Sequence, residues 1–275
     1  MKKLNLISFA LVVVLTAGLV SCQKKETATA VNPDEISATT KSQIKALGFS
    51  TDDVKKVDDG YLVEGDIVLT EENLQGKTDN KLLTIAETEQ YRTTNLVTGL
   101  PRVITVSISN LPTVYSTALN TMISRYNALG LRITFQRAST GTTGNINIVG
   151  FNQGPSGGSI TLGSSGFPTS SGQPFNQVRM NTNAAAYGTN PNVNYIASVL
   201  QHEVGHCIGF RHTDYANRAF SCGGTAVNEG ASNVGAIRIP NTPSGPDAAS
   251  FMLACSNGGN RTFNANDIVA LNYLY

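Results

Sequence analysis

The chain has 275 residues, of which 14% are charged, and its formal net charge is +1. This balance, together with the lack of any basic run, argues against a nucleic-acid partner. The length allows one well-buried core plus a smaller segment, and we expect the chain to act as a monomer.

Residues 1–22 are typical of a bacterial lipoprotein signal peptide. Two lysines precede a mostly apolar run, which closes on Leu19-Val20-Ser21-Cys22 and so resembles a lipobox. Cleavage before Cys22 would make it the first mature residue and tether the chain to a membrane through lipid. An ordinary secretory signal with an incidental cysteine is the alternative. We expect a lipid-anchored protein of the bacterial cell envelope, at the outer membrane or the cell surface.

Residues 23–90 are predicted to form a tether followed by a small pro-segment. The polar composition of 23–32 favours a flexible tether. A modest helix is expected within 34–58 and a strand over 60–70, whereas the polar stretch 71–92 predicts a linker that a protease can cut.

A compact domain with an α+β fold is predicted over residues 91–275. Its stretch 154–177 is rich in Gly, Ser and Pro, which favours irregular loops and a short edge strand. Asn264 and Asp267 have the spacing of a capping box at the start of the last helix. The patterns of apolar residues predict strands at 102–108, 131–137, 145–151 and 178–181, and helices at 112–129, 194–209 and 264–275.

All three histidines of the chain lie within residues 202–212, as His202, His206 and His212. On a helix, His202 and His206 share one face and can bind one metal ion. Gly209 permits the left-handed turn that ends the helix, so that His212 can arrive as a third ligand. Three imidazoles suit Zn²⁺ and leave a fourth position for water. Glu203 is placed to take a proton from that water.

The pattern HExxHxxGxxH over residues 202–212 resembles the metzincin metallopeptidases, and the surrounding sequence is similar to their bacterial "HEIGH" group. The resemblance implies a zinc endopeptidase that hydrolyses extracellular or surface proteins, with Glu203 as the general base. It implies a twisted, mostly parallel sheet with an edge strand, a long helix, a zinc-binding helix, a methionine turn and a C-terminal helix. Met252 is the candidate for the methionine turn, and ordinary core packing is its alternative role. Ala254 stands where astacins carry an additional tyrosine ligand, so three histidines and water are expected.

A second resemblance lies in the predicted pro-segment. Glu64-Gly65-Asp66-Ile67 is similar to the pro-segment motif of astacin-like enzymes, in which an aspartate occupies the water position of zinc. Asp66 would then keep the uncleaved chain latent as a zymogen. Cleavage within 71–92 would free the metal and release the catalytic domain from the membrane. A plain strand and turn is the alternative interpretation.

The cysteines allow one pairing to be proposed. If Cys22 carries lipid, three cysteines remain and one of them must be free. Cys207 falls in the middle of the apolar stripe of its predicted helix, which favours a buried thiol. Cys222 and Cys255 are then the expected disulfide, because an exported protein can oxidise them.

Two further interpretations of the histidine motif stay open. Thermolysin-like metallopeptidases take a downstream glutamate as the third ligand, and Glu229 is the candidate here. A lipid-anchored binding or adhesion module would use zinc only structurally, and such a site has no need of Glu203. Tyr215 is either a residue that assists the oxyanion or a packing tyrosine. Asp214 is expected to cap local backbone.

Overall fold

The computed structural model describes residues 35–75, 90–226, 228–229, 235–243 and 245–275. The predicted signal peptide, its Cys22 and most of the predicted cleavage stretch lie outside these residues. Residues 36–275 pack as one compact unit. Within the described part of the chain, no helix combines the length and the apolar character that a membrane span requires.

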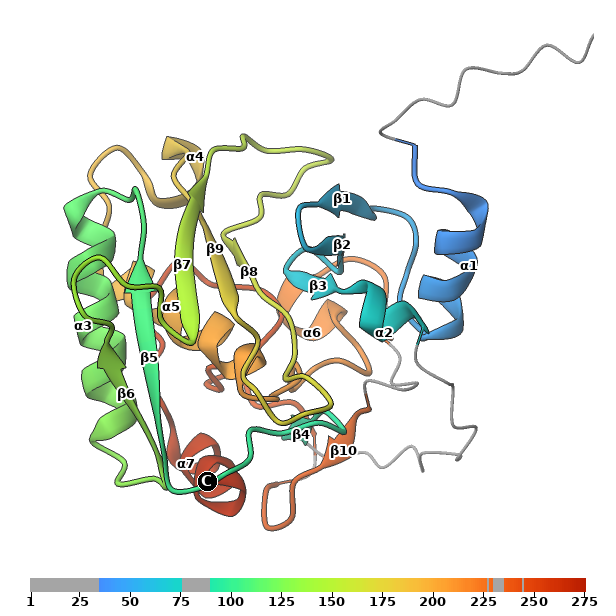
Figure 1. Ribbon diagram of the computed structural model, residues 1–275. Coiled ribbons are helices and arrows are strands. Elements are labelled where there is room, and N and C mark those ends of the chain that lie inside the picture. The colour runs from blue at the N-terminus through green and yellow to red at the C-terminus, as the bar shows by residue number, and fades with distance from the viewer. Residues whose placement is uncertain (1–34, 76–89, 227, 230–234, 244) are drawn as a thin grey trace, which may run out of the picture. The chain divides into compact units, whose positions relative to one another are not determined.

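The core of the described chain is built on a five-stranded sheet with the order β6-β5-β7-β9-β8 (Figure 1). Strands β6, β5, β7 and β9 run parallel, and the short edge strand β8 pairs antiparallel with β9. This mostly parallel sheet with an antiparallel edge strand confirms the predicted fold class. The bounds are β5 Arg102–Ile108, β6 Ile133–Arg137, β7 Ile146–Phe151, β8 Gly163–Ser164 and β9 Gln177–Asn181.

Two long helices, α3 (Thr113–Asn127) and α5 (Val193–Cys207), pack against each other and against the sheet. Asn192 caps the start of helix α5, and its side chain accepts hydrogen bonds from two amides of the first turn. Every residue of α5 from Ile196 to Cys207 is buried. The polar side chains of this helix therefore face partners inside the protein, because burying them without partners would be costly. Shorter elements complete the domain: β4 Tyr91–Arg92 pairs with β10 Ile237–Arg238, while α4 is Ala184–Tyr187 and α6 is Ala219–Cys222.

Residues 35–75, the described part of the predicted pro-segment (hereafter the pro-segment), form their own small layer, with helix α1 (Ala38–Ala46), strands β1 (Lys55–Val57), β2 (Gly60–Val63) and β3 (Ile67–Leu69), and helix α2 (Glu71–Gln75). The three strands form an antiparallel meander. The single strand expected over 60–70 is therefore wrong. Glu64 and Gly65 have φ values of 55° and 97°, so the chain reverses there and Asp66 follows the turn.

The pro-segment is joined to the edge of the main sheet, just beyond β8. The amide of Val68 donates to the Ser165 carbonyl at 2.7 Å, and the Ser165 amide donates to the Asp66 carbonyl at 2.9 Å. Phe167 completes the apolar core of the pro-segment, together with Ile44, Leu47, Phe49, Val63, Ile67, Leu69 and Leu74. The pro-segment thus extends the sheet by a short parallel bridge at the edge that β8 would otherwise leave open.

The C-terminal helix α7 (Ala265–Leu274) anchors the loop that carries Met252. Asn264 and Asp267 form the predicted capping box. The fully buried Asp267 carboxylate also accepts hydrogen bonds from the Gln90 amide nitrogen, the Ser250 hydroxyl and the Phe251 amide. Burial raises the pKa of Asp267 to about 6, so the group is ionised at neutral pH and can accept from all of these donors.

We predict that Asp267→Asn lowers the free energy of unfolding by about 2–4 kcal/mol at pH 7, because an amide NH₂ group would face donors that now bond to a charged oxygen. Chemical denaturation measures the loss. Asp247→Asn is the matched control, since Asp247 is only partly buried and accepts from two asparagine side chains. A loss for Asp267→Asn no larger than that of the control would contradict the anchoring role.

Candidate metal centre and active site

The structure brings the three histidines together at one point. Their Nε2 atoms are 3.1 Å apart for His206 and His202, 3.1 Å for His206 and His212, and 3.3 Å for His212 and His202. His202 and His206 lie one turn apart on α5, and His212 follows the end of that helix. His206 and His212 are fully buried, and His202 is 9% exposed.

Hydrogen bonds on the other side of each ring fix the tautomer. The Nδ1 of His202 lies 2.9 Å from the Phe251 carbonyl oxygen, and that of His206 lies 2.9 Å from the Phe210 carbonyl oxygen. A carbonyl only accepts, so each Nδ1 carries the hydrogen and each Nε2 presents a lone pair. Burial and the two neighbouring rings also lower the pKa of His206 well below its usual value, which keeps it neutral.

The three Nε2 atoms are arranged as ligands of a zinc ion. Nitrogen lone pairs that converge at such distances repel one another unless a cation lies between them. Ligands at the usual Zn–N distance in a tetrahedral site are about 3.3 Å apart, close to the separations seen here. Each imidazole also has the outer partner that is typical of metal-binding histidines.

Two glycines allow the local geometry. Gly209 has a φ of 106°, and a side chain there would collide with Leu96. The turn it makes brings His212 round to the other two rings. At Gly205, a Cβ would lie 2.5 Å from the Met252 sulfur, so only glycine lets α5 lie directly on this loop. Met252 is fully buried against α5, and its role as the methionine turn stays a prediction.

Glu229 has a role that the sequence analysis did not foresee. Its Oε1 lies 2.5 Å from the Nδ1 of His212, on the side of the ring that faces away from the other histidines. The carboxylate is fully buried, and His212 together with Arg211 and Arg218 lowers its pKa despite burial. Glu229 therefore orients the third histidine, and the thermolysin-like assignment of Glu229 as a ligand finds no support in this geometry.

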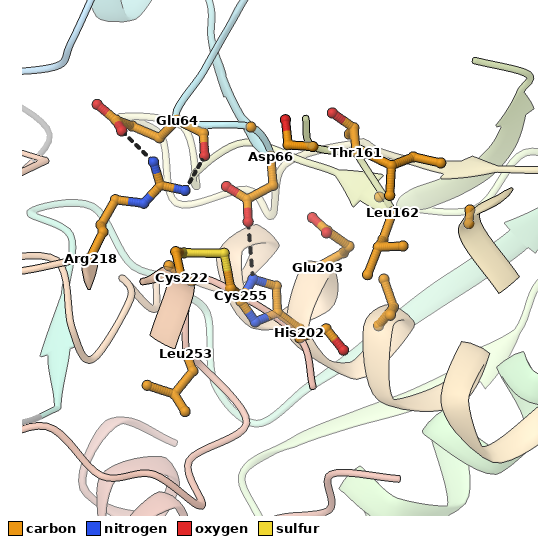
Figure 2. Close-up of a pocket in the computed structure, with 18 of the residues that line it drawn as sticks. Glu64, Asp66, Thr161, Leu162, His202, Glu203, Arg218, Cys222, Leu253 and Cys255 are labelled. Atoms are coloured by element: carbon orange, nitrogen blue, oxygen red, sulfur yellow. Dashed lines mark hydrogen bonds and ion pairs between the residues drawn. A yellow bond between two sulfur atoms is a disulfide. The ribbon is translucent and has the colours of Figure 1, made fainter. Parts of the chain in front are cut away.

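Asp66 from the pro-segment reaches the same point. Its Oδ2 lies 3.2 Å from the Nε2 of His212. The same oxygen lies 3.6 Å from the Nε2 of His202 (Figure 2). Asp66, His202, His206 and His212 each offer one ligand atom, and these four atoms all lie within 4.8 Å of one another. The second oxygen, Oδ1, is buried without a hydrogen-bond partner among the described residues. A carboxylate so placed suits a metal ion better than it suits a closed hydrogen-bond network.

Glu203 lies beside this cluster and is 2% exposed. The Ser165 hydroxyl lies 2.8 Å from its Oε2 and 2.9 Å from its backbone carbonyl. Burial and the nearby Asp66 carboxylate raise the pKa of Glu203 well above its usual value. A carboxylate with a raised pKa is a stronger proton acceptor, which suits acid–base chemistry near neutral pH. Ser165, another residue that the sequence analysis missed, holds this carboxylate in place.

A cleft of about 670 Å³ contains His202, Glu203 and Asp66. The disulfide Cys222–Cys255 lines it, with an S–S distance of 2.08 Å, while Cys207 is buried and, among the described cysteines, free.

Two residues near the cleft serve the backbone and the packing. The Asp214 carboxylate accepts from the amide of Ala254 and from Ser221, so it ties the segment after His212 to the loop that carries Met252. Tyr215 packs edge-on against Tyr91, with ring centroids 4.3 Å apart, and is not among the residues that line the cleft. Its position is that of a packing residue.

No curated protein shows a significant match to the chain. Among solved structures, myroilysin is 16% identical with a TM-score of 0.43, and the match covers 67% of this chain and 96% of that one. High choriolytic enzyme 1, a hatching-enzyme zinc protease of the medaka fish Oryzias latipes, is 16% identical with a TM-score of 0.37, covering 62% and 88%. These similarities are too low to carry an argument.

The family comparison is decisive. The model of the dual-action HEIGH metallo-peptidases matches residues 61–275, which include the histidine cluster and Glu203. A structural-zinc binding module is thereby set aside. The chain belongs to the dual-action HEIGH metallo-peptidase family and is a zinc metalloendopeptidase.

Proposed function

We propose that the protein is made as a latent, lipid-anchored endopeptidase in which His202, His206 and His212 hold the zinc ion and Glu203 is the general base. The convergence of the three Nε2 atoms at one point, beside a cleft that His202 and Glu203 line, is the observation that carries this proposal. Its substrates are extracellular or surface proteins.

The chain's own residues suggest how the reaction is organised. Zinc, when bound, supplies a Lewis acid that polarises the scissile carbonyl and makes water more acidic. Glu203 accepts the proton of the attacking water and delivers it to the leaving amine. Ser165 keeps the Glu203 carboxylate oriented. The edge strand β8 offers backbone groups to which an extended peptide can add as a further strand.

Latency follows from the placement of the pro-segment. Asp66 lies against the histidines, in the position that the attacking water requires. The backbone of Asp66 and Val68 is hydrogen-bonded to the amide and the carbonyl of Ser165, so a substrate strand cannot use these two groups. Both the nucleophile and the substrate strand are thus excluded together. Cleavage within 71–92 would break the covalent link between the pro-segment and the catalytic domain, and would separate that domain from the lipid on Cys22.

Glu203→Gln should lower turnover at least ~100-fold in chain that has been activated by cleavage, because the amide keeps the size of the side chain but cannot accept the proton. Hydrolysis of an unstructured protein such as casein measures the change. Zinc content, measured in parallel, should stay near that of the parent. Parental turnover in a zinc-loaded Glu203→Gln protein would show that another group is the base.

Asp66→Ala should make the uncleaved chain active, because the water position opens while the covalent link stays intact. The assay compares the initial rates of uncleaved parent and variant, with gel electrophoresis to verify that neither has been cut. Asp58→Ala is the matched control, since Asp58 is an exposed pro-segment residue whose contact, with Arg179, spans 3.7 Å. An inactive Asp66→Ala chain that becomes active on cleavage would remove Asp66 from the latency mechanism.

Cys22→Ala should move the protein out of the membrane fraction, because the variant lacks the acceptor for lipid. Mass spectrometry of the mature N-terminus and fractionation of expressing bacteria measure this. A parent protein with an unmodified Cys22, or a variant that stays in the membrane fraction, would argue against the lipid anchor.

A further inference from the structure

Arg218 reaches into the cleft from the residue before helix α6 and makes a paired contact with the pro-segment. Its Nη1 lies 2.6 Å from the Glu64 carboxylate, and its Nη2 donates to the Glu64 carbonyl at 2.5 Å (Figure 2). The Glu64 side chain is largely buried, and its second carboxylate oxygen accepts from the Ser50 amide at 2.8 Å. The guanidinium thus binds both the side chain and the backbone of one acidic residue.

Arg218 is also held by a residue outside the pro-segment. Its Nε lies 3.1 Å from the Oε1 of Glu229, the carboxylate that orients His212. This contact belongs to the catalytic domain and does not depend on Glu64. When the pro-segment leaves, Arg218 therefore keeps this ion pair, which lacks hydrogen-bond geometry, while Nη1 and Nη2 lose the partners that they have in the latent chain.

The pro-segment and the catalytic domain contribute charged residues of mostly opposite sign to the lining of the cleft. Among its described lining residues, the pro-segment contributes Asp53, Lys55, Glu64 and Asp66, and the catalytic domain contributes His202, Glu203, Arg218 and Arg261. Three of the four charged pro-segment residues are acidic, whereas the catalytic domain presents two guanidinium groups. Removal of the pro-segment leaves a cleft with exposed positive charge beside the metal centre.

We propose that Arg218 selects an acidic side chain in the substrate, and that Glu64 fills this subsite in the latent chain. This inference rests on the proposed function, since it concerns the same active site. A guanidinium binds a carboxylate through a planar pair of donors, which gives both strength and geometric preference. Glu64 is two residues from Asp66, so the selected side chain lies within about two residues of the bond that is cleaved.

Binding measurements test the subsite without relying on hydrolysis. The folded full-length chain, carrying Glu203→Gln, is cut with trypsin at Lys77 or Lys81, and the pro-segment is removed. Calorimetry then compares a peptide of residues 60–70 with its Glu64→Gln form. The change should weaken binding about tenfold or more, because a charge-assisted contact is lost. For the Arg218→Gln chain, the dissociation constants of the same two peptides should differ by less than about twofold. An equal loss in both chains would overturn the proposal.

Substrate selection provides the second test, on chain with Glu203 intact. A peptide library should show acidic residues enriched on one side of the cleaved bond, and a matched Glu/Gln substrate pair should differ about tenfold in kcat/KM. In Arg218→Gln the kcat/KM values for the Glu and Gln substrates should become nearly equal, whatever the overall rate of that variant, and Arg137→Gln, at a distant exposed arginine that contacts Ser116, should retain the preference.

The outcomes are distinguishable. Cleavage of neutral peptides without any acidic preference would overturn the role of Arg218 and leave the peptidase function standing. An equal fall for acidic and neutral peptides in Arg218→Gln would also overturn it, because this pattern indicates a structural role. If that variant does not fold, the matched Glu/Gln substrate pair still tests the subsite on the parent chain. Equal kcat/KM values for the two substrates would reject the subsite.

Discussion

Three nitrogen lone pairs converge in a space from which water is largely excluded, and the rest of the active site depends on this constraint. Each imidazole is turned toward the common point by an acceptor behind it: the carbonyls of Phe251 and Phe210, and the carboxylate of Glu229. Without a cation the arrangement would be repulsive. With zinc, the same arrangement becomes a ligand set in which each imidazole is oriented by the acceptor behind it.

The buried charges around the metal form one connected system. Glu229 bridges His212, Arg211 and Arg218, and Arg218 in turn holds Glu64 of the pro-segment. Arg211, fully buried, also faces the ring of Phe49 at 5.2 Å. The pro-segment therefore touches the metal centre directly through Asp66 and indirectly through the partners of its third histidine. Such pairing is required, because an isolated buried charge would be very costly.

Local patterns in the sequence predicted the parts of the site that are local in space. The spacing of His202 and His206 on one helix, the turn at Gly209 and the capping box at Asn264 all depend on a few neighbouring residues. The strand pattern and the histidine motif together also indicated the fold class. The position of Asp66 was suggested by a short resemblance, and the structure places it against the histidines.

Other features escaped prediction because they depend on contacts between distant segments. Glu229 lies in an irregular stretch rich in Gly and Asn, where periodicity gives no sign of which carboxylate turns inward. Ser165 and Arg218 are single polar residues whose roles depend on the pairing of β3 with the sheet edge and on the position of α6. The strand expected over 60–70 was wrong because Gly65 can start a reversal that alternation of apolar residues does not reveal.

Anomalous diffraction at the zinc absorption edge, from crystals of the uncleaved chain, tests the central claim most directly. We predict a single strong peak at the centre of the cluster, within ~2.0–2.2 Å of the Nε2 atoms of His202, His206 and His212 and of the Asp66 carboxylate. A peak held by Glu229, or a zinc ion bound without Asp66 while the chain remains inactive, would contradict the account.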